Sequence, residues 1–92
     1  MTYELILLDE AKLHLEEWRK SGQKKTLIKI LSLLEELREH PTTGTGQVEQ
    51  LKGNLNGYWS RRIDKKSRFI YTIEEAQVKV LVISMKGHYE IK

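Results

Sequence analysis

The stretch YWSRRIDKKSRFIYTIEEAQVKVLVISM, residues 58–85, decides the fold of this chain. It contains three runs that are rich in β-branched and aromatic residues, as strands are: 58–63, 68–73 and 78–85. The connections between these runs are short, which favours antiparallel neighbours. A further run at 48–51 precedes them, after a connector of small residues at 42–46 that we expect to be mobile. This half of the chain therefore predicts an antiparallel meander of β-strands.

The N-terminal half predicts one strand followed by two helices. An apolar run at residues 3–8 indicates a strand, and Asp9 then offers a side-chain oxygen to cap a helix that continues to about residue 20. A second helix is expected from about residue 23 to residue 39, because leucine and isoleucine recur there on one stripe. Pro41 ends this helix, since the residue before a proline is pushed out of the helical region.

Size and composition indicate one small globular domain. With 92 residues, 39% of them hydrophobic, the chain is long enough for a core without disulfides. We therefore expect a single α+β domain over residues 1–92, with both helices on one face of an antiparallel sheet and the other face free for function. The apolar runs are too short to span a membrane, and the N-terminus shows no signal-peptide pattern, so we expect a cytoplasmic protein.

Cysteine and histidine show no pattern of a metal site in this chain. The chain has no cysteine, and its three histidines have no metal-binding spacing: His14, His40 and His88. We therefore expect neither a metal nor another cofactor.

Positive charge is concentrated in the middle of the chain. The whole chain has a formal net charge of +3, but residues 47–72 contain six basic and two acidic residues. Residues 9–39, in contrast, contain seven of each and are neutral. A local positive field of this kind favours a polyanion or an acidic protein as partner.

Alternation along the predicted strands assigns the side chains to two faces. Trp59, Ile63 and Phe69 fall on the side that should meet the helices. Arg62 and Arg68 then fall together on the opposite, open face. The sequence thus predicts two arginines that converge on a helix-free surface.

Four motifs resemble those of one family of bacterial toxins. They are Glu-x-Leu-Lys at 49–52, Asn-Leu-Asn-Gly-Tyr-Trp-Ser-Arg-Arg-Ile at 54–63, Arg-Phe-Ile-Tyr at 68–71 and His-Tyr at 88–89. In order and spacing they resemble the YoeB/Txe toxins of type II toxin–antitoxin systems. The predicted order of strand, two helices and meander also suits the RelE-like toxin fold, which is related to the microbial RNase fold.

The resemblance implies an endoribonuclease that cuts messenger RNA on the ribosome. In this family the ribose 2′-hydroxyl attacks the adjacent phosphorus without a metal and leaves a 2′,3′-cyclic phosphate. The implied partners are the ribosome, messenger RNA and an acidic antitoxin whose flexible tail covers Arg62, Arg68 and His88. No membrane partner is implied, and a homodimer stays open.

The resemblance also gives roles to the matched residues. Glu49 matches the base that takes the 2′-hydroxyl proton, and His88 matches the acid that protonates the leaving 5′-oxygen. Arg68, with Arg62 beside it, matches the groups that stabilise charge on the phosphorane.

Three further residues complete the predicted site. Tyr89 is expected to stack on a base or to position the phosphate, and Lys52 is expected to add positive charge near the RNA backbone. Arg61 is included among the phosphate-binding or RNA-binding candidates, although strand alternation favours it as the structural member of the Arg61–Arg62 pair.

Two other classes of function stay open from the sequence. One is a gyrase-poisoning toxin of the same fold, which would not need a base and an acid beside the arginines. The other is a non-catalytic module that binds RNA or protein through its basic surface alone.

Overall fold

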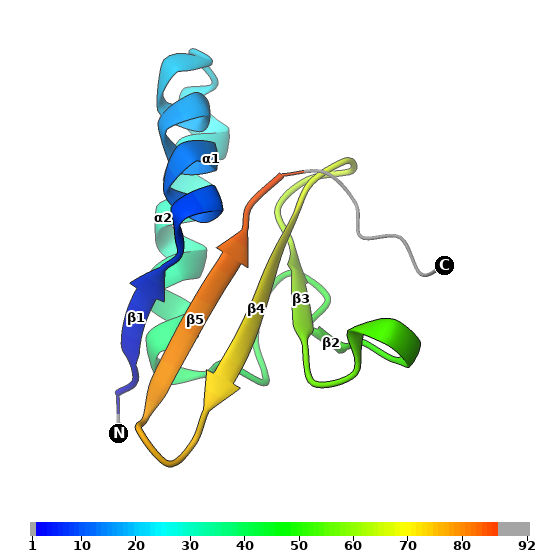
Figure 1. The fold of residues 1–92 in the computed structure, drawn as a ribbon. Helices are drawn as coiled ribbons and strands as arrows, with labels where there is room; N and C mark the ends of the chain where they lie inside the picture. The colour runs from blue at the N-terminus through cyan, green and yellow to red at the C-terminus, as the bar shows by residue number, and fades with distance from the viewer. Residues whose placement is uncertain (1, 87–92) are drawn as a thin grey trace.

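The computed structural model describes residues 2–86 of the chain (Figure 1). Its elements follow in the order β1 Glu4–Leu7, α1 Asp9–Lys20, α2 Lys24–Glu39, β2 Glu49–Gln50, the 3-10 turn η1 Gly53–Leu55, β3 Trp59–Arg62, β4 Arg68–Glu74 and β5 Lys79–Ser84. Every predicted helix and strand is thus present, and most of the strands are shorter than expected. No helix within residues 2–86 is long and apolar enough to cross a membrane.

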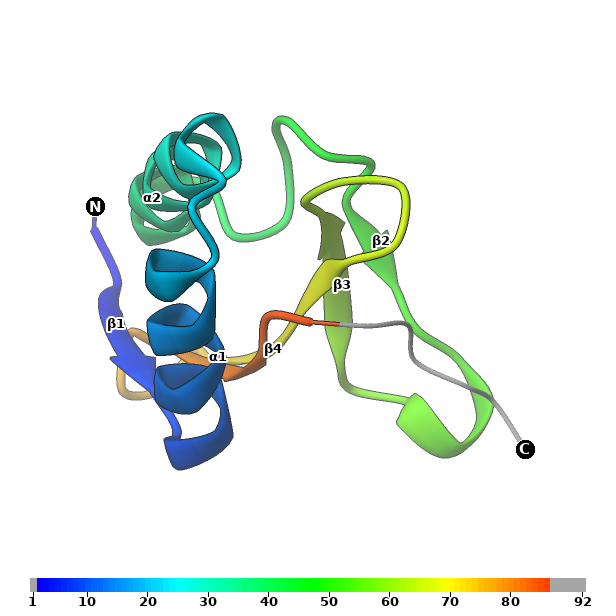
Figure 2. The same ribbon diagram turned by 90° about the horizontal axis from the view of Figure 1, so that it is seen from above.

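The strands form one mixed sheet in the order β1-β5-β4-β3-β2. The meander from β2 to β5 is antiparallel, as predicted, but β1 pairs with β5 in parallel. This parallel pair exists because the chain crosses over through both helices between β1 and the meander. The α+β architecture with both helices on one face is confirmed, and β3 and β2 extend beyond the helices (Figures 1 and 2).

One hydrophobic core lies between the helices and the sheet. The fully buried apolar side chains come from α1, α2, β4, β5 and the segments that flank the strands: Ala11, Ile30, Leu37, Ile63, Phe69, Tyr71, Val80, Val82 and Met85. Asp9 does not cap α1 as predicted. The N-cap is Leu8, and Asp9 lies in the first turn, where its charge still interacts favourably with the helix dipole.

The connector at residues 42–46 is held by hydrogen bonds, in contrast to the expected mobile segment. The Thr45 N–H donates to the Glu36 carboxylate, and the Arg62 N–H donates to the Gly46 carbonyl. Gly44 has a φ of +111°, and a Cβ at this position would collide with the Glu36 carboxylate. The glycine therefore allows the connector to pass directly over the end of α2.

A buried phenol anchors the start of the same connector. The Tyr71 hydroxyl donates to the Pro41 carbonyl at 2.7 Å. Burial raises the pKa of Tyr71 above its ordinary value of 10.0, and the nearby Arg61 opposes this only in part. Tyr71 therefore stays protonated and keeps its hydrogen bond at neutral pH.

Candidate active site on the open sheet face

Strand register brings Glu49, Arg62 and Arg68 to the same face of the sheet. Glu49 on β2 lies opposite Ser60 on β3, and Arg62 on β3 lies opposite Arg68 on β4. Directly opposed residues point to the same side of a sheet, as do residues two apart along one strand. The side chains of Glu49, Ser60, Arg62 and Arg68 therefore share one face of the sheet. Trp59, Arg61 and the helices lie on the other face. The predicted convergence of the two arginines on the helix-free face is consistent with this register.

Ser60 lies between the carboxylate and the arginines. Its side chain is fully buried, and Nη1 of Arg68 lies 3.5 Å from its hydroxyl oxygen. The guanidinium of Arg68 therefore reaches from β4 to β3, where it approaches the residue that lies opposite Glu49. Sequence reasoning did not select Ser60 as a site residue. The available signal was its place two residues before Arg62, on the same face.

Arg62 is oriented by neutral oxygens. Its Nε donates to the Asp64 carbonyl and its Nη1 donates to the Gln47 side-chain oxygen, both at 3.2 Å. Within residues 2–86, neither Arg62 nor Arg68 forms an ion pair. Two like charges directly opposite on neighbouring strands destabilise a sheet. The pair thus provides positive charge that the described part of the fold does not neutralise, as a site for an anion requires.

Glu49 and Lys52 lie at the edge of the sheet. Both side chains are exposed, Glu49 on the edge strand β2 and Lys52 immediately before η1. An exposed carboxylate on an edge strand is open to a large ligand such as RNA. Lys52 follows on the same strand-to-turn segment, three residues after Glu49.

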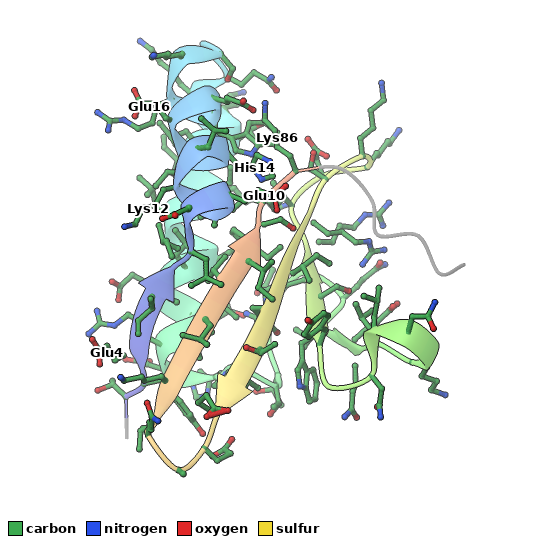
Figure 3. All side chains as sticks on the ribbon, viewed as in Figure 1. Glu4, Glu10, Lys12, His14, Glu16 and Lys86 are labelled. Carbon is green, nitrogen blue, oxygen red and sulfur yellow. The ribbon has the colours of Figure 1, made fainter. Side chains whose placement is uncertain are left out.

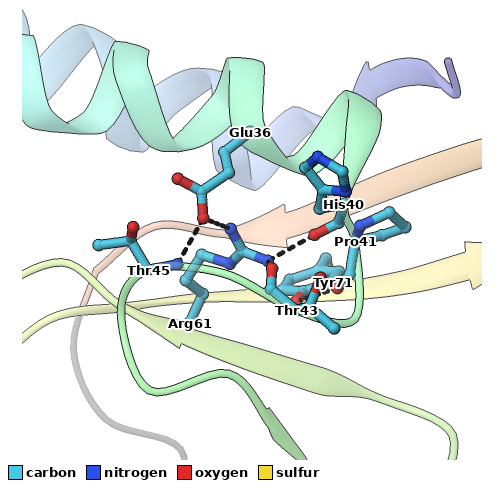
Figure 4. Close-up of polar contacts among 7 residues, drawn as sticks. All are labelled: Glu36, His40, Pro41, Thr43, Thr45, Arg61 and Tyr71. Carbon is cyan, nitrogen blue, oxygen red and sulfur yellow. Dashed lines mark hydrogen bonds and ion pairs between the residues drawn. The ribbon is translucent and has the colours of Figure 1, made fainter.

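Arg61 lies inside the protein, which corrects its inclusion among the phosphate-binding candidates. Its side chain is 0% exposed, and Nη1 lies 2.8 Å from Oε1 of Glu36. Its Nη2 donates to the carbonyls of His40 at 2.8 Å and of Thr43 at 2.7 Å (Figure 4). Arg61 therefore joins β3 to the end of α2 and to the connector. The structural role favoured by strand alternation is correct.

His88 and Tyr89 lie outside the described residues, and their predicted roles stay predictions. The last described residues, Met85 and Lys86, follow β5 at the end of the sheet where β4 begins with Arg68. Among residues 2–86 no group of histidine and acidic side chains is arranged to hold a metal ion.

Comparison with known proteins agrees with this architecture. A family model described as the YoeB-like toxin of bacterial type II toxin–antitoxin systems matches residues 9–89. The chain is 39% identical to Toxin YoeB of Synechocystis over 85 residues, which cover 92% of this chain and 96% of the relative. Among solved structures, a YoeB/ParE toxin from Agrobacterium tumefaciens superposes with a TM-score of 0.86 at 31% identity, covering 94% of this chain and 99% of that one.

Two solved structures of the YoeB toxin of Staphylococcus aureus are also similar to this chain. The toxin has been solved as a dimer and in a heterotetrameric YoeB–YefM toxin–antitoxin complex, with TM-scores of 0.81 and 0.78. In both, the identity is 31% and the match covers 97% of this chain and 100% of the other.

The fold is shared with the RelBE2 toxin–antitoxin complex of Mycobacterium tuberculosis, which superposes with a TM-score of 0.75 at 17% identity, and is therefore the RelE-like fold. The family-model match over residues 9–89 is more specific than this likeness of fold. The chain belongs to the family of YoeB-like toxins of bacterial type II toxin–antitoxin systems.

Proposed function

We propose that this chain is an endoribonuclease that cleaves messenger RNA on the ribosome and is the toxin of a toxin–antitoxin pair. The proposal rests on Arg62 and Arg68, which lie opposite each other on a helix-free face. Glu49 lies on the same face, opposite Ser60, which precedes Arg62 by two residues on β3. Like charges placed opposite each other cost stability, so the presence of this pair favours a functional role in binding an anion. A phosphodiester is the anion that family membership suggests.

The arginines would bind the phosphate and stabilise its transition state. Negative charge accumulates on the non-bridging oxygens as the phosphorane forms, and guanidinium groups donate paired hydrogen bonds to such oxygens. Arg62 is held in place by the Asp64 carbonyl and Gln47, and Arg68 lies against Ser60. Both donors are thus partly oriented before RNA binds, which lowers the cost of reorganisation in the reaction.

Glu49 would act as the base and His88 as the acid. Glu49 takes the proton of the ribose 2′-hydroxyl while the 2′-oxygen forms a bond to phosphorus. The bond between phosphorus and the 5′-oxygen breaks, and His88 supplies the proton that this oxygen needs. The products are a 2′,3′-cyclic phosphate and a 5′-hydroxyl end. We assign Tyr89 to positioning the base or the phosphate, and Lys52 to the RNA backbone.

Replacing Arg68 by alanine tests the role of the opposed arginines. We expect the rate of messenger cleavage on purified ribosomes to fall about 10²–10³-fold, the usual effect of removing one transition-state donor. Arg19→Ala is the matched control, because Arg19 is an exposed arginine of α1 whose partner is Glu16. It should cleave at the wild-type rate.

Two results would overturn the proposal. One is an Arg68→Ala variant that cleaves as fast as the wild type. The other is a wild-type protein that arrests growth without cutting messenger RNA, with or without ribosomes. The second result would favour the gyrase-poisoning or the non-catalytic binding alternative.

The positive charge of the open sheet face favours an acidic antitoxin as partner. The six basic residues of 47–72 outnumber the two acidic ones. Arg62 and Arg68 lie opposite each other at the open face, and in the described part of the chain neither forms an ion pair. The Staphylococcus aureus relative is solved with the YefM antitoxin and also as a dimer. We propose that an antitoxin tail covers Arg62, Arg68 and His88, and that the free toxin also self-associates.

A further inference from the structure

The segment before β2 has one residue more than its pairing with β3 requires. The Leu51 N–H donates to the Tyr58 carbonyl, and hydrogen-bonded pairs recur at every second residue of an antiparallel ladder. Four residues away on each strand, the Arg62 N–H is therefore expected to donate to the Gln47 carbonyl. It donates to the Gly46 carbonyl instead. Gln47 is thus an extra residue opposite Arg62, as in a β-bulge.

The backbone of Gln47 lies in the left-handed region. Its φ is +52°, a value that glycine adopts freely and that costs free energy in a residue with a side chain. A glycine at position 47 would form the same bulge without this strain. A strained residue next to a proposed site therefore points to a use for its side chain.

The side chain of Gln47 contacts the guanidinium of Arg62. Its Oε1 accepts from Nη1 of Arg62 at 3.2 Å, and the Asp64 carbonyl accepts from Nε at the same distance. Two acceptors on different nitrogens fix the plane of the guanidinium, whereas the Asp64 carbonyl alone would let it turn. Both acceptors are uncharged, so Arg62 is oriented without an ion pair. A glutamate at position 47 would orient Arg62 but would also neutralise it.

We infer that Gln47 is a positioning residue for Arg62, and that the bulge serves to direct its side chain to the guanidinium. The inference rests on the proposed function, in which Arg62 and Arg68 stabilise the phosphorane. Gln47 lies outside the motifs that carry the family resemblance. Bulges are common next to active sites, where they redirect a side chain. Gln47 also precedes Glu49 by two residues, so the bulge lies where the chain enters the strand of the proposed base.

Two substitutions remove the acceptor in different ways. Gln47→Met keeps a side chain of similar length, and Gln47→Gly removes the side chain together with the backbone strain. In both we expect kcat for cleavage on ribosomes to fall about tenfold with little change in KM, because Arg62 keeps its charge but loses its orientation. Gln47→Gly should nevertheless be at least as stable as the wild type, since glycine fits a positive φ. A merely structural role for Gln47 would leave kcat unchanged in this variant.

Gln77→Met is the matched control for the glutamine. Gln77 is exposed in the turn between β4 and β5, at the opposite end of β4 from Arg68. This variant should cleave with the kcat and KM of the wild type.

Gln47→Glu separates orientation from charge. The carboxylate keeps an oxygen for Nη1 of Arg62, but its negative charge competes with the phosphate. We expect KM to rise by about 2–5-fold, the range of an exposed ion pair, with kcat closer to the wild type than in Gln47→Met. Lys12→Gln is the control, because it changes the net charge equally from α1, on the other side of the molecule from β2 (Figure 3). Its KM should not change.

A double-mutant cycle shows whether Gln47 acts through Arg62. In an Arg62→Ala background, Gln47→Met should lower kcat no further, because the group that it orients is absent. Nuclear spin relaxation at Nε of Arg62 provides a readout that needs no cleavage. The guanidinium should become more mobile in Gln47→Met and should keep its wild-type mobility in Gln77→Met.

The outcomes distinguish this inference from the proposed function. Unchanged mobility of Arg62 in Gln47→Met would show that Gln47 does not hold the guanidinium, and the inference would fail. The positioning role would also fail if Gln47→Met lowered kcat equally with and without Arg62, or did not lower it at all, while the nuclease assignment would stand. A wild-type protein that cuts no RNA would refute the proposed function and the positioning role together, and the mobility of Arg62 would still report the contact.

Discussion

Arg61→Ala is expected to destabilise the fold by about 3–5 kcal/mol, the usual cost of removing one partner from a buried ion pair. The substitution leaves the Glu36 carboxylate without its cation and the carbonyls of His40 and Thr43 without their donor. A domain of this size has a free energy of unfolding of about 5–15 kcal/mol, so a large part of its stability would be lost. Urea unfolding followed by circular dichroism measures the change.

The neighbouring arginine provides the control for this experiment. Arg62→Ala removes an equally long cationic side chain from the open face, where its acceptors are Gln47 and the Asp64 carbonyl. We expect it to change the free energy of unfolding by less than about 1 kcal/mol. Equal losses for Arg61→Ala and Arg62→Ala would show that the buried pair is not a principal link between β3 and α2. Arg61→Lys should not rescue, because one ammonium cannot replace a planar guanidinium fork that reaches three acceptors.

Glu49→Gln is expected to lower the single-turnover rate of messenger cleavage by about 10²–10⁴-fold, the usual contribution of a general base. Glutamine keeps the size of the side chain but does not take a proton at neutral pH. Because Glu49 is exposed on an edge strand, its replacement should leave the free energy of unfolding nearly unchanged. Binding of messenger RNA should persist, since Arg62 and Arg68 are intact.

Glu74→Gln is the matched control for the carboxylate. Glu74 is also exposed and ends β4, where it pairs with Lys79 away from the arginines. The cleavage rate of the Glu74→Gln protein should equal that of the wild type. A Glu49→Gln protein that cleaves at full rate would remove Glu49 from the mechanism and return the open face to a binding role.

The open face could be predicted from the sequence because it depends only on local rules. Alternation along the strands and short turns between them are enough to place Arg62 beside Arg68, and the register agrees. The same alternation assigns Arg61 to the opposite side, where it is buried. Its inclusion among the phosphate-binding candidates is corrected by the burial of its guanidinium.

The contacts made across the fold could not be predicted in this way. The ion pair between Glu36 and Arg61 joins residues 25 positions apart, and the bond from Trp18 to Met85 joins residues 67 apart. No periodicity relates such positions. The connector was expected to be mobile because its side chains are small, but its backbone supplies one of the acceptors of Arg61, the Thr43 carbonyl. Likewise, the parallel pairing of β1 with β5 depends on where the two helices return the chain to the sheet. Patterns of neighbouring residues do not predict this.

The chemical identity of the cut ends tests the central claim most directly. Glu49, the opposed arginines and His88 are proposed to act on one phosphodiester, with the ribose 2′-hydroxyl as nucleophile. A defined messenger cleaved on purified ribosomes should therefore carry a 2′,3′-cyclic phosphate upstream of the cut and a 5′-hydroxyl downstream. A free 3′-hydroxyl with a 5′-phosphate would contradict the account, because that outcome requires water rather than the 2′-hydroxyl to attack phosphorus.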